Sequence, residues 1–136
     1  MAFCAFCAIV AGTSPCFAVH EDDDTLAFMD ALPMTPGHVL VVPKRHVTDL
    51  FDLDDDLGGP LFATARIVAN RQREILGAKG VNLLNNNGYA ADQSQFHIHL
   101  HLIPRYGGDR LLHPWERTFG SRAEMSALAE RLRGSP

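Results

Sequence analysis

The most regular pattern of polar and apolar positions along the chain spans residues 97–103, where histidine alternates with large apolar residues. Successive side chains of a β-strand point to opposite faces, so this alternation is typical of a half-buried strand. We predict a strand over residues 95–103, ended by Pro104, with one row against a core and the other facing a cleft. The polar row consists of His97, His99 and His101, and the apolar row consists of Ile98, Leu100 and Leu102.

Apolar residues at helical spacing predict one long helix in the middle of the chain. Pro60, which is tolerated in a first turn, marks its expected start, and Gly77 marks its end. The face expected to pack consists of Leu61, Ala65, Val68, Gln72 and Ile75. Shorter apolar segments predict helices over residues 4–11 and 122–132 and strands over residues 16–21, 25–31, 38–42 and 81–85.

These elements favour an α+β fold. Several strands with only one long helix between them cannot form a doubly wound parallel sheet, and short connections suit antiparallel pairing. We therefore predict an antiparallel β-sheet meander with one long helix and short terminal helices packed on it. The length of 136 residues, 46% of them apolar, suits a single domain over residues 1–136. Its core is expected over about residues 3–106, and a tail and helix over residues 107–136.

Charge and cysteine usage argue against several function classes. The net charge of -4 disfavours a general nucleic-acid binder, which needs clustered Lys and Arg to contact phosphates. The apolar start carries no basic residue before Lys44 and is too short to span a bilayer, so we expect no leader, no membrane anchor and a cytoplasmic location. Three cysteines, two of them in a Cys-x-x-Cys pair, suit metal or thiol chemistry better than a disulfide framework.

The row of histidines permits two kinds of chemistry. His-x-His on a strand can hold a catalytic zinc ion, with a third ligand from elsewhere and an open position for water. Alternatively, one neutral imidazole can attack an electrophile such as phosphorus. Neutral hydrogen-bonding side chains directly before the row, rather than carboxylates, favour phosphate oxygens as partners. These residues are Asn85, Asn86, Asn87, Gln93, Ser94 and Gln95.

The histidine row is also the strongest part of a family resemblance. The segment from His97 to Ile103 resembles the signature of the histidine-triad (HIT) family, in which histidine alternates with apolar residues. Three further segments have the family's order: Cys4-x-x-Cys7-x-Ile9-Val10-x-Gly12, Pro36-Gly37-His38-Val39-Leu40-Val41-Val42-Pro43-Lys44-x-His46, and Asn86-x-Gly88 with Gln93-Ser94. The match extends to about Tyr106, so the resemblance implies a HIT fold for nearly the whole chain.

The resemblance implies hydrolysis of nucleotidyl compounds through a covalent intermediate. His99, in the middle of the triad, would attack the α-phosphorus and carry the nucleotidyl group until water releases it. His101 would bind or polarise the phosphate near the leaving group, and His38 would complete the polar cluster from a neighbouring strand. Phosphate oxygens or the leaving group would be held by Ser94, Asn86 and Gln93, which would stabilise the charge that develops there.

The resemblance also implies where a nucleoside would bind. Asp30 stands where family members hydrogen-bond the ribose hydroxyls, and a carboxylate is a natural acceptor for a diol. The nucleobase, expected to be a purine, would lie in a slot lined by Phe6, Ile9, Phe28 and Leu40. Packing in an ordinary core is an equally open reading for each of these four side chains.

A second site follows from similarity to a bacterial branch of the family that holds structural zinc. Its ligands here would be Cys4, Cys7, His46 and His97. Two thiolates and two imidazoles make a closed tetrahedral set, which is structural rather than catalytic. The alternative for the cysteine pair is two buried thiols, and Cys16 is expected to be a small buried apolar residue.

Two departures from the family pattern bear on the leaving group. Asp92 stands where many members have Gly, and its charge would repel a long polyphosphate, although Asp can adopt a left-handed turn. Gln95 replaces a usual apolar residue on the face of the triad. The segment His113-Pro114-Trp115 is expected to be a hydrophobic anchor, with a dimer or lid contact as the alternative.

Together these observations predict a homodimeric HIT-type hydrolase of purine nucleotidyl compounds, with nucleoside phosphoramidates or related monophosphate conjugates as the leading substrates. Three alternatives remain. The chain could hydrolyse dinucleoside polyphosphates, it could bind nucleotides with little turnover, or it could be a zinc-dependent hydrolase.

Overall fold

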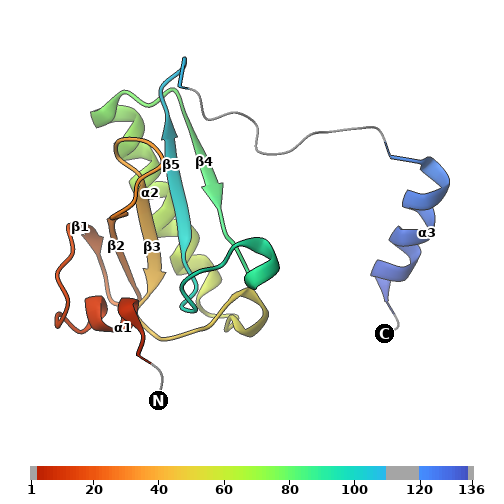
Figure 1. Ribbon diagram of the computed structural model, residues 1–136, viewed down its shortest axis with the longest axis horizontal. Helices are drawn as coiled ribbons and strands as arrows, with labels where there is room; N and C mark the ends of the chain where they lie inside the picture. The colour runs from red at the N-terminus through yellow and green to blue at the C-terminus, as the bar shows by residue number, and fades with distance from the viewer. Residues whose placement is uncertain (1–2, 110–119, 135–136) are drawn as a thin grey trace.

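The computed structural model describes residues 3–109 and 120–134 and is built on a five-stranded sheet (Figure 1). The elements are α1 (Ala5–Val10), β1 (Ala18–Glu21), β2 (Thr25–Met29), β3 (Val39–Pro43), η1 (Leu50–Asp52), α2 (Gly58–Leu76), β4 (Gly80–Leu84), η2 (Tyr89–Ala91), β5 (Leu100–Arg105) and α3 (Arg122–Arg133). All four neighbouring strand pairs are antiparallel. The α+β prediction is therefore confirmed.

The strand order is β1-β2-β3-β5-β4, so only the first three strands form a simple meander. The chain leaves β3, runs through α2 and returns at the edge of the sheet as β4. The last strand, β5, then pairs with β3 on one side and β4 on the other. This order puts the segment around His101 in the middle of the sheet, next to the segment around His38.

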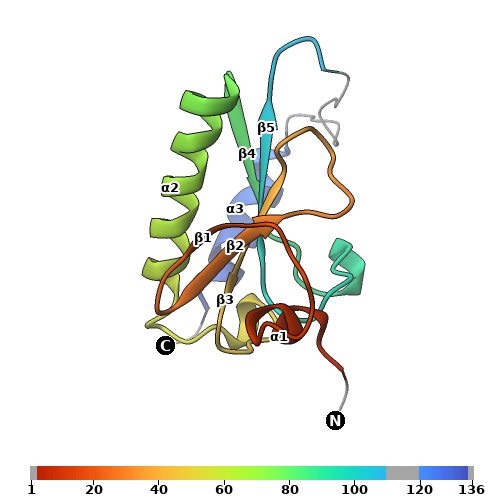
Figure 2. The same cartoon turned by 90° about the vertical axis from the view of Figure 1, so that its left-hand side faces the viewer.

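The long helix α2 covers one face of the sheet, as Figure 2 shows in side view. Its buried residues are Leu61, Thr64, Ala65, Val68 and Gln72. Of these, Leu61, Ala65 and Val68 pack against apolar side chains of β2, β3 and β5. The helix begins at Gly58, two residues before the expected start, and ends at Gly77, whose φ of 73° is left-handed. Ile75 was expected on the packed face but is 73% exposed, because the last turn of α2 borders an open cleft instead of a strand.

The opposite face of the sheet carries α1 near its lower end (Figure 2). Phe6 of α1 is buried in a second apolar cluster with Leu26, Phe28, Leu40 and Val42 of β2 and β3. Side chains on one face of β2 and β3 therefore pack in the first apolar cluster, and those on the other face pack in the second. For this reason β3 is buried at every position. The candidate chemistry lies on the α1 side.

The strand of the histidine segment begins later than predicted, at Leu100, and residues 95–97 form a bend. The ladder between β3 and β5 stops at the pair Val41–Leu100. Beyond that pair the carbonyl of Pro43 accepts a hydrogen bond from the His97 ring rather than from a backbone group of β5. Pro104 does not end the strand, since β3 does not pair beyond Leu102 and the missing N–H of Pro104 leaves no gap in that ladder.

The C-terminal helix α3 differs from the expectation that both terminal helices pack on the sheet. No residue of α3 is buried, and the helix stands clear of the rest of the chain in Figure 1. Its apolar residues Met125, Leu128 and Leu132 are exposed. The segment His113-Pro114-Trp115 lies outside the described residues. Within the described ranges, no helix combines the length and the apolar character that crossing a membrane requires.

Candidate active site and metal centre

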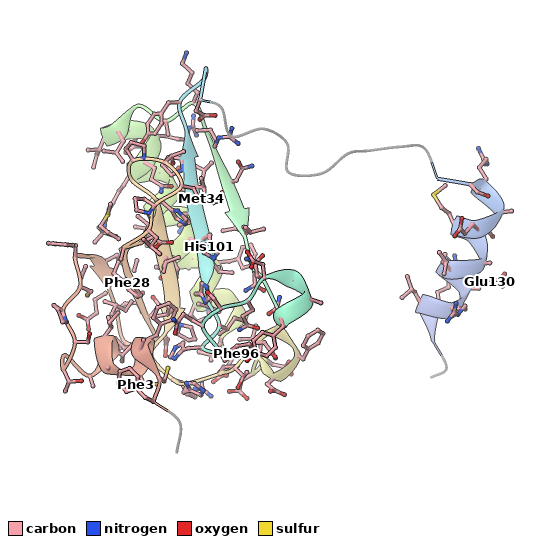
Figure 3. The ribbon with its side chains drawn as sticks, in the orientation of Figure 1. Phe3, Phe28, Met34, Phe96, His101 and Glu130 are labelled. Atoms are coloured by element: carbon pink, nitrogen blue, oxygen red, sulfur yellow. The ribbon has the colours of Figure 1, made fainter. Side chains whose placement is uncertain are left out.

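A cavity of about 760 Å³ opens on the α1 face of the sheet and contains two of the three histidines of the row. Figure 3 labels Phe28 on β2, Met34 on the loop after β2 and His101 on β5, and these segments surround the site. The apolar part of the cavity includes the four predicted slot residues Phe6, Ile9, Phe28 and Leu40, together with Pro15, Cys16 and Phe17. Its polar part includes Asp30, Ser94, Gln95, His99 and His101. One cavity thus joins an apolar slot to a polar end.

The backbone fixes the hydrogen on the His99 ring. Nδ1 of His99 lies 2.9 Å from the carbonyl oxygen of His97, and a carbonyl can only accept. Nδ1 therefore carries the proton, and Nε2 of a neutral ring keeps its lone pair. His99 is 5% exposed and lines the cavity, and burial lowers its pKa below the ordinary value of 6.5. The ring is therefore neutral at pH 7, with a lone pair on Nε2 that could accept a hydrogen bond or attack an electrophile.

A chain of hydrogen bonds fixes the other two rings. The backbone N–H of Met34 donates to Nδ1 of His38 at 3.0 Å, so Nε2 of neutral His38 carries the proton. That Nε2 lies 3.0 Å from Nδ1 of His101 and donates to it. Nε2 of His101 then carries the remaining proton and is a hydrogen-bond donor. His38 is 1% exposed, so this arrangement is shielded from water.

Burial also determines the charge of this pair. It lowers the pKa of His38, and together with the neighbouring His99 and His38 it lowers the pKa of His101 to about 4. Asp30 opposes this effect, since its Oδ2 lies 3.4 Å from Nε2 of His38 and 3.9 Å from Nδ1 of His101. The cluster is therefore neutral at pH 7 except for one carboxylate at the end of the apolar slot.

The loop before β5 is braced by its own amides. Gln93, expected to hold phosphate, is buried; its Nε2 donates to the carbonyls of Thr48 and Gln95, and its Oε1 accepts from the N–H of Gly88. Asn85 donates to the carbonyl of His99, and Asn87 donates to Asn85. These amides hold the loop against the histidine segment, with both Gln93 protons already committed.

The other predicted phosphate contacts separate in space. Ser94 and Gln95 are exposed and line the cavity beside His99 and His101. Asn86 is half-buried in the loop and is not one of the described residues that line the cavity. Asp92 adopts the left-handed conformation that the sequence allowed, with φ of 67°. Ser94 and Gln95 are therefore the side chains of this loop that line the cavity, and the roles of Ser94, Asn86 and Gln93 as phosphate ligands stay predictions.

The four predicted zinc ligands come together below the active site. Their ligand atoms all lie within 4.8 Å of one another. Sγ of Cys4 lies 3.4 Å and Sγ of Cys7 3.6 Å from Nδ1 of His97, and Sγ of Cys7 lies 3.3 Å from Nδ1 of His46. A tetrahedral zinc ion with ordinary Zn–S and Zn–N bonds would place sulfur and nitrogen roughly 3.5 Å apart. The residues therefore fit a closed Cys₂His₂ site.

The tautomer of His97 supports the same assignment. Nε2 of His97 lies 2.8 Å from the carbonyl oxygen of Pro43 and must donate to it, so Nδ1 directs a lone pair at the two sulfurs. By contrast, Asp30, His38 and His101 also form a potential metal-binding group, but Nε2 of His38 carries a proton there and has no lone pair to give. The donor chemistry thus favours metal at the cysteines and not in the active site.

Sequence reasoning missed the partners that are backbone groups. The carbonyls of His97 and Pro43 and the N–H of Met34 set the tautomers of the three buried rings. No side-chain pattern can reveal them. Cys16, expected to be a small buried apolar residue, is half-buried: it packs against the apolar cluster around Phe6 and also lines the cavity beside Phe17.

Comparisons with known proteins agree with this geometry. The family model described as HIT domain matches residues 11–108. The chain is 43% identical over 114 residues to "Protein hit" of Bacillus subtilis, covering 83% of this chain and 79% of that protein. It is 38% identical over 108 residues to the adenylylsulfatase HINT3 of Arabidopsis thaliana, covering 79% of this chain and 55% of that protein.

A solved structure is also similar in fold. The crystal structure of a zinc-bound histidine triad family protein from Mycobacterium smegmatis has a TM-score of 0.78 and 39% identity, and 97% of each chain is covered. Its description names zinc, which is the metal that the Cys₂His₂ cluster of this chain fits.

Proposed function

The chain belongs to the HIT domain family, and from this premise we propose that it hydrolyses purine nucleoside phosphoramidates or related nucleoside monophosphate conjugates through a nucleotidyl group on His99. Binding or hydrolysis of nucleotides is the general activity that the family membership carries.

The observation that carries the proposal is the lone pair on Nε2 of His99. This ring is buried, neutral and held in one tautomer by the His97 carbonyl, and it lines a cavity of about 760 Å³. A nucleophile in a fixed orientation attacks without the entropic cost of being positioned during the reaction. The lone pair on Nε2 is therefore held in a fixed ring at the wall of the cavity, where a bound substrate could meet it.

The chemistry splits hydrolysis into two displacements. Nε2 of His99 attacks the α-phosphorus, the bond from phosphorus to the leaving group breaks, and the nucleotidyl group remains on the imidazole. Water then attacks the same phosphorus and releases the nucleoside monophosphate and the free ring. His101, whose Nε2–H is the donor end of the chain from Met34 through His38, would hydrogen-bond a phosphoryl oxygen in both steps.

The shape of the cavity supports a nucleoside monophosphate unit. The planar base would lie among Phe6, Ile9, Phe28 and Leu40, and the ribose hydroxyls would reach the carboxylate of Asp30. At the polar end of the cavity, Ser94 and Gln95 are exposed, so a leaving group there would contact solvent. Such an open position suits substrates that differ in their leaving group. A sulfate leaving group, as the name of the Arabidopsis relative indicates for that protein, belongs to the same chemical class.

The metal that the cysteine cluster would hold is structural in this proposal. All four coordination positions of a tetrahedral zinc ion would be occupied by Cys4, Cys7, His46 and His97. No position would then be left for water. Such an ion would supply stability and not bond cleavage. We also propose that the protein acts as a homodimer, as the resemblance implies, and in the cytoplasm, which its odd number of cysteines and its Cys-x-x-Cys pair favour.

Steady-state kinetics of the purified protein tests the proposal. Adenosine phosphoramidate, adenylyl sulfate and a diadenosine polyphosphate would be compared for the wild type, His99→Gln and the matched control His20→Gln, whose histidine lies on β1 outside the cavity. We expect turnover of the first two substrates, near-complete loss in His99→Gln, and wild-type rates in His20→Gln. Preference for the dinucleotide would favour the polyphosphate alternative, and undiminished activity of His99→Gln would refute the proposal.

A further inference from the structure

The short helix α1 serves two sites at once. Its six residues and the residue before it supply two of the four metal ligands, Cys4 and Cys7, and two walls of the nucleobase slot, Phe6 and Ile9. Cys4 and Cys7, three residues apart, face the metal cluster, while Phe6 and Ile9, also three residues apart, face the nucleobase slot. Whatever fixes α1 for the metal also fixes it for the base.

The helix has little stability of its own. Isolated helices shorter than about 12 residues are marginal in water, and α1 has six residues. It depends on contacts with the rest of the fold. Phe6 is buried against β2 and β3 with Ala5, Ile9 and Val10 packed beside it, and the two sulfurs reach His46 and His97 in the segments next to β3 and β5. A metal ion would turn those sulfur contacts into bonds.

Phe6 links the metal ligands to the proposed nucleophile. Its ring makes an edge contact with His97, at 5.9 Å between centroids, and another with His99, at 5.2 Å. A third edge contact joins it to Phe28 of the slot at 5.5 Å. One buried ring therefore touches a metal ligand, the proposed nucleophile and the base-binding wall.

We propose that metal binding at the cysteine cluster assembles the nucleotide slot, and that Phe6 is the positioning residue that couples the two sites. The inference rests on the proposed function, because it takes the cavity to be a nucleotide site. With metal bound, α1 is fixed, Phe6 packs edge-on against the His99 ring, and the slot is complete. Without metal, α1 is held only by apolar packing and by weak sulfur–imidazole contacts, so the nucleotide must help to order it.

Thermodynamic linkage makes this proposal reciprocal. If metal raises the affinity for a nucleotide by some factor, the nucleotide must raise the affinity for metal by the same factor. Couplings between sites in proteins are typically about 5- to 150-fold. Because one helix joins both sites directly, we expect a factor of about 10 or more.

Calorimetry with AMP and Zn²⁺ tests the inference on the full chain. AMP would be titrated into zinc-loaded and metal-free protein, and Zn²⁺ would be titrated with and without saturating AMP, with far-UV circular dichroism reporting the fold of each form. We expect AMP to bind at least about tenfold more weakly to the metal-free protein, and AMP to strengthen zinc binding by the same factor.

The variant Phe6→Leu separates coupling from loss of structure, because leucine keeps the site apolar but cannot make the edge contacts. The zinc-loaded variant should keep its zinc affinity within about threefold, as its four ligands are unchanged, while the metal effect on AMP falls to about twofold or less. The control is Phe62→Leu, on the exposed side of α2, which should retain the full coupling.

Three results would overturn the inference. Equal AMP affinity with and without zinc would exclude coupling while leaving the proposed function intact. Full coupling in Phe6→Leu would exclude Phe6 as its carrier. Absence of AMP binding by either form would remove both the inference and the nucleotide site on which it rests.

Discussion

Replacement of His38 tests how the active site fixes the protonation of His101. The ring is 1% exposed and makes two hydrogen bonds, one from the N–H of Met34 and one to Nδ1 of His101, each at 3.0 Å. His38→Ala removes both. His38→Asn should keep the first, because the Asn Oδ1 occupies nearly the position of Nδ1, but its side chain is too short to replace Nε2.

The expected magnitudes follow from those two contacts. A buried polar group left without its partner costs ~1–3 kcal/mol, so His38→Ala should lower the free energy of unfolding by about 2–4 kcal/mol. His38→Asn should recover about half of that loss, since Met34 regains an acceptor. Both variants leave His101 free to place its proton on Nδ1, which removes a donor aimed at the phosphoryl oxygens. Loss of one such donor typically costs ~100-fold in kcat.

Urea denaturation and steady-state kinetics with an adenosine phosphoramidate measure the two effects separately. We expect His38→Asn to be more stable than His38→Ala but equally slow, with KM within a few-fold of the wild type. His20→Asn serves as the matched control and should change neither kcat nor KM, because His20 lies outside the cavity. If His38→Asn turns over at the wild-type rate, the chain of hydrogen bonds does not set the protonation of His101, and the reasoning fails.

The remaining predictions concern stability and metal. The pKa of His101 is about 4 in the folded chain against an ordinary 6.5, so the unfolded chain binds more protons between these values. Stability should therefore fall as the pH is lowered from about 6.5 to 4, and urea midpoints at pH 7.5 and 4.5 would measure the fall; identical midpoints would contradict the burial argument. A chelator, or Cys7→Ser, should lower the melting temperature of zinc-loaded protein, whereas an unchanged melting curve would argue for a site without metal. Thr64→Val removes the buried hydroxyl that lies 2.7 Å from the Thr25 hydroxyl and donates to Asp22, and it should cost about 1–2 kcal/mol by chemical denaturation; no change would show that the bond from Thr25 to Asp22 is sufficient without Thr64.

The alternation of histidine and apolar residues predicted the two faces of the site correctly. Ile98, Leu100 and Leu102 are buried on one side, and His99 and His101 line the cavity on the other. The alternation holds from Ile98 onward, whereas His97 lies in a bend and points at the cysteine pair instead of the cavity. The start of the strand depends on Pro43, in another strand, and no pattern within the histidine segment reports it.

Side chains whose partners are distant backbone groups were the ones the sequence could not describe. The phosphate contact of Gln93 stays a prediction, and the fold places its Nε2 against the carbonyls of Thr48 and Gln95. An amide can serve either purpose, and only the fold decides which partners lie within reach. Ile75 likewise has the right helical spacing for burial but lies where the sheet no longer covers α2.

The composition of the metal centre was predictable only through the family resemblance. Cys4 and Cys7 are 39 or more residues before His46 and His97, so no local spacing joins the two pairs. The fold brings them together because α1 packs under the sheet at the point where β3 ends and the histidine segment begins. The Cys-x-x-Cys pair indicated metal chemistry, but only the fold shows that His46 and His97 lie beside it.

Mass spectrometry of a quenched reaction tests the covalent mechanism most directly. The protein would be mixed with an adenylated substrate, quenched within milliseconds, digested and searched for an adenylyl group on each histidine. We predict the adduct on His99 alone, formed and lost at rates that account for turnover. Rapid hydrolysis with no adduct at any quench time, or an adduct that forms on another residue and turns over, would contradict the assignment of His99 as the nucleophile.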